Sequence, residues 1–314
     1  MKKLIDQIKL FWKFIVRQSR HIRLPLFDGL SLYDVLRFFF RGIYEGSVTT
    51  RASSIAFSFF LALFPGIIFL FTLIPFIALA IDGFQEQVFE TLSNIMPPDT
   101  YEVTKSTIDD ILTQKRGDLL SFSFFLALFL ATNGTQSLMT NFTNSWHNIG
   151  YRNFWMQYLM SLGLTIVLSL LLLFGIVIVI LSEDFVEYWV IYSNLEFDFL
   201  DYSKFYAISR SLVLVAIVLI SISLIFYIGP TKRKVWRFIS PGSILATTLI
   251  IVSSLGFEYY VANFSQYNKL YGSIGTLMVI MLWIYINAIG LILGFELNAS
   301  TESAKQSNQE ELTF

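Results

Sequence analysis

The residues that could do chemistry inside the apolar stretches of this chain are amides, not acids or bases. Asn133, Gln136 and Asn141 lie in the uncharged stretch 119–151, and Asn287 lies in the stretch 270–295. Amide side chains donate and accept hydrogen bonds but carry no titratable proton. Such residues line a polar cavity or hold helices together by hydrogen bonds, and both alternatives remain open here.

Pro65 lies near the centre of the uncharged stretch 52–81. Because proline has no amide proton, it cannot donate to the carbonyl of Leu61, and the helix is expected to kink or break there. One alternative is a packing kink, and the other is a broken helix that lines a transport cavity. The candidate cavity residues are therefore Pro65, Asn133, Gln136, Asn141 and Asn287.

Two charged residues border the apolar stretches at the same predicted membrane face. Arg51 directly precedes the first stretch, and Glu296 directly follows the last. We expect them to form an ion pair that ties the first and last helices together across the inner mouth. The alternative is two residues that extend separately toward the interface without touching.

The sequence contains few residues that could catalyse a reaction or bind a metal ion. The chain has no cysteine, its two histidines are His21 and His147, and the acidic pair Glu183-Asp184 falls on the predicted outer side. A nuclease would need clustered carboxylates or histidines to hold its metal ion, and an ATPase would need a glycine-rich phosphate loop. We therefore expect no enzyme, no cofactor, no bound metal and no nucleic-acid partner.

The helices that position these residues can be predicted from the charge map, which is the distribution of charged residues along the chain. All 22 basic and 23 acidic side chains lie outside six uncharged stretches, each as long as the ~20 residues that a helix needs to cross a bilayer. This pattern predicts an all-α polytopic membrane protein with a six-helix transmembrane bundle. The predicted spans are residues 53–81, 119–140, 154–181, 211–229, 239–257 and 272–295.

The loops between these spans differ in charge from one side to the other. One side carries sixteen Lys and Arg residues and the opposite side carries six. Since basic residues concentrate in cytoplasmic loops, both termini are expected in the cytoplasm. Residues 51–299 then form the membrane domain, with an outer helical loop at 82–118 and an outer acidic and aromatic loop at 183–210.

The two ends of the chain are expected to lie outside the bilayer. Residues 1–50 are predicted to form basic amphipathic helices, and residues 300–314 a disordered cytoplasmic tail. The basic N-terminal arm either lies on the membrane and binds anionic lipids or packs on the protein's own cytoplasmic surface.

Short motifs occur in order along the chain, from Arg51-Ala52 and Leu63-Phe64-Pro65 to Gly294 and Asn298. These motifs resemble those of the YihY/BrkB family of bacterial inner-membrane proteins, formerly mislabelled ribonuclease BN. Arg51-Ala52 with Leu63-Phe64-Pro65 resembles the family's first-span motif. The other motif positions extend over the rest of a match that spans about residues 35–300. They are Asn144, Trp146, Arg152, Pro230, Trp236, Arg237, Pro241, Gly242, Tyr271, Gly272, Trp283, Gly294 and Asn298.

The resemblance implies a multi-pass protein of the bacterial inner membrane, of a kind described as a transporter or an envelope-integrity factor. Two functions from different classes remain open. The first is a permease for a lipid or other amphiphile, with a polar cavity around Pro65, Asn133, Gln136 and Asn287. The second is a non-transporting envelope scaffold that binds lipid or partner proteins. The sequence indicates neither the substrate nor the oligomeric state.

Overall fold

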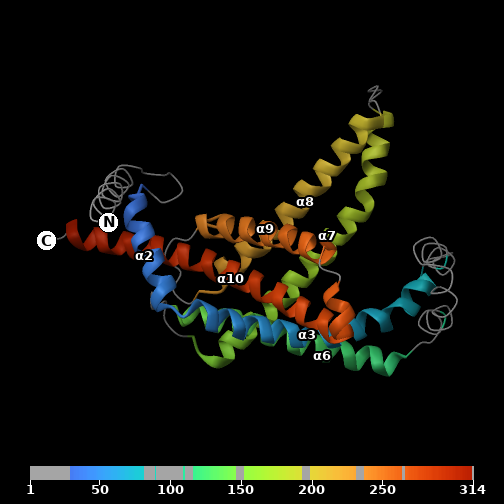
Figure 1. Ribbon diagram of the computed structural model, residues 1–314, viewed down its shortest axis with the longest axis horizontal. Helices are drawn as coiled ribbons and strands as arrows, with labels where there is room; N and C mark the ends of the chain where they lie inside the picture. The colour runs from blue at the N-terminus through green and yellow to red at the C-terminus, as the bar shows by residue number, and fades with distance from the viewer. Residues whose placement is uncertain are drawn as a thin grey trace. The chain divides into compact units, whose positions relative to one another are not determined.

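A computed structural model describes residues 29–80, 89, 109, 116–145, 152–192, 199–230, 237–263 and 266–312. Within these ranges the regular structure is helical, without strands, as the charge map predicts. The helices are α2 (Leu32–Glu45), α3 (Val48–Ala80), α6 (Gly117–Thr143), α7 (Phe154–Tyr192), α8 (Phe199–Ile228), α9 (Pro241–Asn263) and α10 (Gln266–Leu312) (Figure 1). The first predicted amphipathic helix, the basic arm and most of the loop 82–118 lie outside the described residues.

Six of these helices are long and apolar enough to cross a membrane. Only 17% to 22% of the residues in the most apolar part of each are buried within the protein, so most of their side chains face outward. In a membrane protein this outward apolar surface contacts lipid. The spans are Val48–Phe69, Gly117–Thr143, Phe154–Gly175, Ile208–Ile228, Pro241–Tyr260 and Leu277–Ser307.

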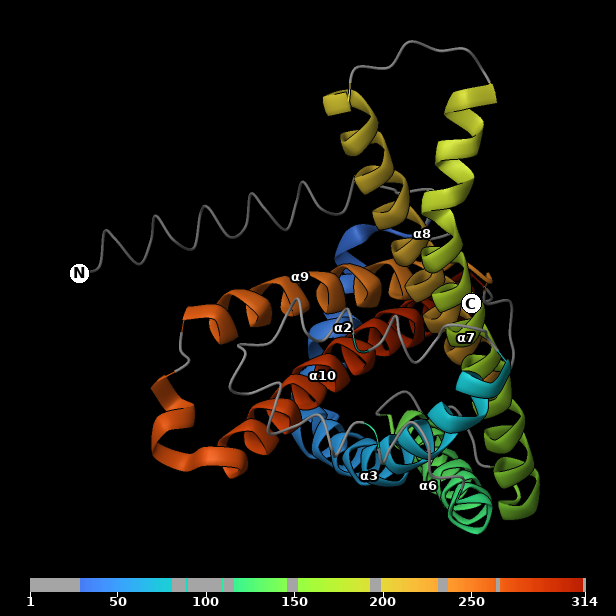
Figure 2. The same cartoon turned by 90° about the vertical axis from the view of Figure 1, so that its right-hand side faces the viewer.

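The chain divides into two compact units, residues 58–134 and the remainder. In the larger unit α10 packs against both α9 and α2, while α8 packs against α7 and α9 (Figure 2). Its core contains three phenylalanines from three helices: the rings of Phe142 and Phe295 stack at 4.0 Å, and Phe226 meets both edge-on.

The smaller unit contains α3 from residue 58 onward and α6 up to residue 134. The rings of Phe69 and Phe124 lie 5.4 Å apart, and the hydroxyls of Thr72 and Ser123 lie 3.5 Å apart. Helix α3 continues through the buried Pro65 and through Pro75. The predicted alternative of a helix broken at Pro65 is therefore wrong.

Two predictions about the ends of helices are also wrong. Residues 183–192 and 199–210 continue α7 and α8 instead of forming an outer loop, because no proline or glycine interrupts them. Residues 300–312 continue α10 instead of forming a disordered tail. There Ala304 packs with Leu30 and Val35 at the start of α2, which stabilises the last turns of the helix.

Candidate functional site

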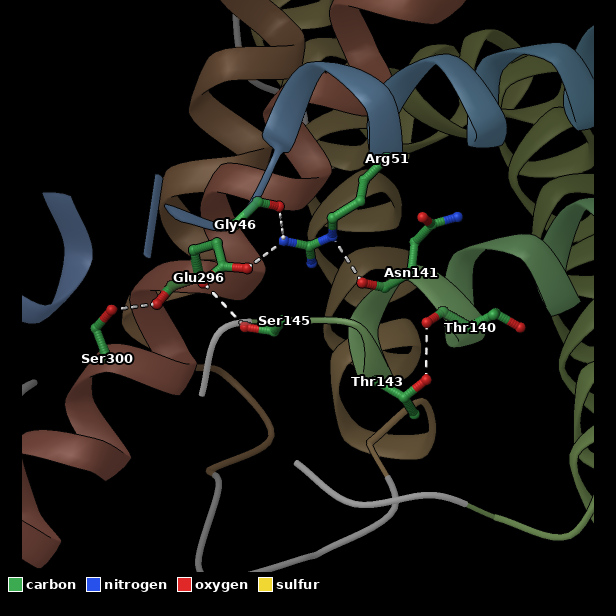
Figure 3. A network of polar contacts seen from close by, with 8 residues as sticks. All are labelled: Gly46, Arg51, Thr140, Asn141, Thr143, Ser145, Glu296 and Ser300. Atoms are coloured by element: carbon green, nitrogen blue, oxygen red, sulfur yellow. Dashed lines mark hydrogen bonds and ion pairs between the residues drawn. The ribbon is translucent and has the colours of Figure 1, made fainter. Parts of the chain in front are cut away.

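Arg51, in the first turn of α3, donates hydrogen bonds to three different residues. Its side chain is only 5% exposed. The guanidinium Nε donates to the backbone oxygen of Asn141 at 2.8 Å, and Nη1 donates to the backbone oxygen of Gly46 at 3.3 Å. The same Nη1 lies 2.5 Å from Oε1 of Glu296 (Figure 3).

Glu296, on α10, is the partner of this arginine and is fully buried. Its second oxygen, Oε2, accepts a hydrogen bond from the Ser145 hydroxyl at 3.1 Å. Its backbone oxygen accepts from the Ser300 hydroxyl at 2.6 Å. The structure thus brings together the two residues of the expected ion pair, and neither extends separately toward the surface.

The pair links segments that are distant in the sequence. Through Arg51 and Glu296, the corner between α2 and α3, the end of α6 and the middle of α10 are held at one point (Figure 3). Two buried charges are tolerated when they neutralise each other and their remaining atoms are hydrogen-bonded. One atom is an exception, since Arg51 Nη2 is buried and has no hydrogen-bond partner among the described residues.

The corner between α2 and α3 has a constrained backbone. Ser47 has φ of 49°, in the left-handed region that non-glycine residues rarely adopt. At the preceding Gly46, a Cβ atom would collide with the backbone oxygen of Gly42. Since such strain persists only where the surrounding contacts enforce it, the bond from Arg51 to Gly46 helps to fix this corner.

A polar cleft of about 380 Å³ opens beside the ion pair. The amide of Asn141 forms one wall, where its Nδ2 donates to the backbone oxygen of Ser137 at 2.8 Å and reaches the Ser54 hydroxyl at 3.4 Å. The cleft lies at the start of the first span and the end of the second. Its lining residues are Glu45, Gly46, Ser47, Thr50, Arg51, Ser54, Asn141 and Asn144.

Of the five candidate cavity residues, Asn141 lines this cleft and the others do not. Asn287 instead joins two helices: its Oδ1 accepts from the Ser253 hydroxyl of α9 at 3.1 Å, and its Nδ2 donates to the backbone of Trp283. Asn133 and Gln136 are half-buried on α6. Asn287 therefore holds two helices together by hydrogen bonds, which is one of the two alternatives that the sequence left open.

Three motif positions of the last third, Gly242, Gly294 and Asn298, gather where α9 meets α10. Asn298 accepts from the Gly242 amide at 2.8 Å and donates to the Ser240 hydroxyl at 2.8 Å. A Cβ atom on Gly294 would collide with the backbone oxygen of Gly242, so the two helices touch through their backbones. The motif glycines Gly242 and Gly294 thus lie where α9 and α10 approach most closely.

The remaining motif positions have different surroundings. Arg152 donates to the backbone oxygen of the buried Pro230 at 3.1 Å, Arg237 is exposed, and Trp283 packs against Phe257. Pro241 begins α9. Trp146 and Trp236 lie outside the described residues, as does the side chain of Tyr271, and Gly272 belongs to α10.

Sequence reasoning missed several residues of the site. Ser145 is one, since its hydroxyl bonds Glu296. Its place between the motif positions Asn144 and Trp146 is a signal that could have identified it. Ser47, Thr50 and Ser54 carried no such signal, because isolated serines and threonines at the end of a span are common. No cluster of three metal-binding side chains occurs in the part of the chain that the structure describes.

Replacing Asn298 with alanine is expected to destabilise the contact between α9 and α10. The change leaves the Gly242 amide without its acceptor and removes one of the two donors to the Ser240 hydroxyl. An unsatisfied buried group costs about 1–3 kcal/mol. We expect the apparent melting temperature in detergent to fall by several degrees, measured by fluorescence. An unchanged melting temperature would show that Asn298 does not hold these helices together.

The comparisons with known proteins concern most of the chain. The family described as virulence factor BrkB matches residues 39–313. A Bacillus subtilis (strain 168) protein, YfkH, whose name calls it ribonuclease-like, is 29% identical over 272 residues, which cover 85% of this chain and 94% of that protein.

Membrane proteins of the UPF0761 group match a shorter part. One from Xanthomonas campestris pv. campestris (strain B100) is 33% identical over 85 residues, or 27% of this chain and 20% of that protein. Another from Stenotrophomonas maltophilia (strain K279a) is 33% identical over 86 residues with the same coverage. The chain therefore matches about a fifth of the length of these relatives. No solved structure matches.

Proposed function

The chain belongs to the BrkB family of membrane proteins, and from this membership and the cleft beside Arg51 we propose that it is a permease of the bacterial inner membrane. Its substrate is a lipid or another amphiphile, and its activity contributes to envelope integrity. The protein acts without an enzymatic step, a cofactor or a nucleic acid. Its basic N-terminal arm binds anionic lipids.

The observation that carries this proposal is the polar cleft beside the buried ion pair, at the ends of two spans of high mean hydropathy. Even at the end of a span, a buried ion pair is costly to desolvate. Ionisable groups in membrane-spanning segments often mark a pathway or a binding site. A cleft with neutral polar walls accommodates the head of an amphiphile, while apolar helix surfaces contact its tail.

The excess of basic residues supports an orientation with both termini in the cytoplasm. In that orientation the start of the first span and the end of the second lie at the cytoplasmic face. The cleft then opens near the inner leaflet, from which a substrate would enter.

Proteoliposomes test the proposal. We expect the purified protein to move fluorescent lipids between leaflets at least about tenfold faster than protein-free vesicles do, measured by reductive quenching of the outer leaflet. Thr50→Trp, which places a large ring in the cleft, is expected to remove most of this activity. The neighbouring Thr49→Trp is the matched control, because Thr49 is also exposed but does not line the cleft.

Two outcomes of the vesicle experiment would count against the proposal. Lipid movement no faster than in protein-free vesicles, across phospholipid and glycolipid probes, would contradict transport. Equal activity of the Thr50→Trp and Thr49→Trp variants would show that transport does not use this cleft.

The second candidate function is a non-transporting envelope scaffold. The hydrogen bonds of Asn287 and Asn298 favour it. Both amides lie on α10 and bond α9 or Ser240, just before α9, instead of lining the cleft. A scaffold would move no lipid in the vesicle experiment, yet it would retain binding of anionic vesicles through its N-terminal arm.

A further inference from the structure

We propose that the cleft beside Arg51 binds an uncharged, hydroxyl-rich group, such as a glycosyl or glycerol head group. This inference rests on the proposed permease function and names the chemistry of the substrate's polar end. It depends on three features of the cleft: its charge balance, the hydrogen-bonding groups that line it, and its position at the ends of two spans.

The charges around the cleft are balanced in pairs. Glu296 neutralises Arg51 at 2.5 Å, and Arg41 pairs with Glu45 at 3.1 Å. Of the four, Arg51 and Glu45 line the cleft, so its walls carry no net charge. Among the described lining residues, an anionic head group would meet no cation without a counter-ion, and it would lie near the Glu45 carboxylate. A cationic head group would be repelled by Arg51.

The rest of the polar lining suits hydroxyl groups. Ser47 and Thr50 contribute hydroxyls and Asn144 contributes an amide, and these groups can donate and accept. The Ser54 hydroxyl and the Asn141 amide also line the cleft, where they already bond protein groups. A polyol presents the same dual groups at close spacing. A ligand without hydroxyls would displace water from Ser47, Thr50 and Asn144 without replacing the hydrogen bonds of that water.

Arg51 adds a donor that the protein itself does not use. Its Nη2 is buried without a hydrogen-bond partner among the described residues, and Figure 3 shows it between Asn141 and Ser145, with no bond drawn to either. Leaving such a donor unpaired is unfavourable. A hydroxyl oxygen that reaches Nη2 from the cleft would satisfy it.

The position of the cleft distinguishes a head group from an acyl chain. The lining residues belong to the corner before α3, the first turns of α3 and the last turn of α6. These are the ends of two membrane spans, where lipid head groups meet water. The volume of about 380 Å³ is that of a small-ligand pocket, not of a whole lipid.

Binding measured apart from transport tests this inference. We use the full chain in phosphatidylcholine nanodiscs doped with glucosyl diacylglycerol or, separately, phosphatidylglycerol, and count bound lipids by native mass spectrometry. We expect glucosyl lipid to bind at least about tenfold more tightly than phosphatidylglycerol. Thr50→Val should weaken that binding about tenfold, and the adjacent control Thr49→Val should not change it.

A second arm identifies the source of the hydroxyl groups. Free glucose and glycerol, titrated against the glucosyl lipid, should compete if the hydroxyl-rich group alone is recognised, and fail to compete at millimolar concentration if the lipid anchor is also needed. Either result is compatible with binding in the cleft, and the inference is upheld only if Thr50→Val weakens it.

Preference for phosphatidylglycerol, or equal glucosyl-lipid binding by Thr50→Val and Thr49→Val, would overturn the inference. The proposed permease function fails separately. Glucosyl-lipid binding without any lipid movement would contradict transport, while the binding-site inference would stand. Movement of phospholipid without glucosyl-lipid binding would contradict only the head-group assignment.

Discussion

Replacing Glu296 with alanine is expected to lower the free energy of unfolding by about 3–5 kcal/mol, because it leaves the Arg51 charge buried without a counter-ion. Arg51 is 5% exposed, and the carboxylate is its only partner in an ion pair within the described ranges. The Ser145 hydroxyl loses its acceptor at the same time. We expect the apparent melting temperature in detergent to fall by roughly 10 °C.

A double variant separates the charge from the packing. Arg51→Met with Glu296→Leu removes both charges and keeps apolar volume, and such replacements are often neutral. We therefore expect it to recover most of the loss caused by either single change. Exchanging the two charges, Arg51→Glu with Glu296→Arg, should likewise do better than either of its single changes. If neither double variant exceeds its single variants, the two residues are not coupled.

Replacing Gly242 with alanine is expected to cost about 3 kcal/mol, because it forces α9 away from α10. The added Cβ atom would collide with the backbone oxygen of Gly294 and lie 2.6 Å from Cγ of Asn298. Backbone atoms cannot move aside as a flexible side chain can, so the cost falls at the high end of the range for overpacking. Gly294→Ala should behave alike, since its Cβ would lie 2.6 Å from that of Ala246.

Gly256 supplies the matched control on the same helix. A Cβ atom there meets nothing within 4 Å, and alanine is the better helix former by about 1 kcal/mol. Gly256→Ala should therefore leave the melting temperature unchanged or raise it slightly. A similar loss for Gly242→Ala and Gly256→Ala would mean that the close approach of α9 and α10 does not determine stability.

The number of membrane helices could be predicted because each uncharged stretch has the length that a bilayer requires. Their ends could not, since hydropathy marks where a helix leaves lipid and not where it stops. Helices α7 and α8 continue through charged residues such as Glu183 and Lys204, and α10 continues past Lys305. The sequence signal that would indicate an end, proline or glycine, is absent there.

The partnership of Arg51 and Glu296 followed from their shared depth at the edges of two spans. The faces on which the amides lie could not be predicted in the same way. Asn141 lines the cleft and Asn287 bonds Ser253, although both are amides in apolar surroundings. Which neighbour a polar side chain meets depends on helix rotation, and the nearly uniform apolar character of these spans leaves no amphipathic pattern to fix it.

Labelling of a single cysteine tests most directly whether the cleft holds the transported molecule. The chain has no cysteine of its own, so Ser54→Cys introduces one reactive thiol in the cleft wall. A membrane-impermeant maleimide should label it from the cytoplasmic side, and glucosyl lipid should slow the labelling about tenfold. Labelling that is unaffected by every lipid tested, or that occurs only from the opposite side, would contradict a cytoplasmic substrate site at Arg51.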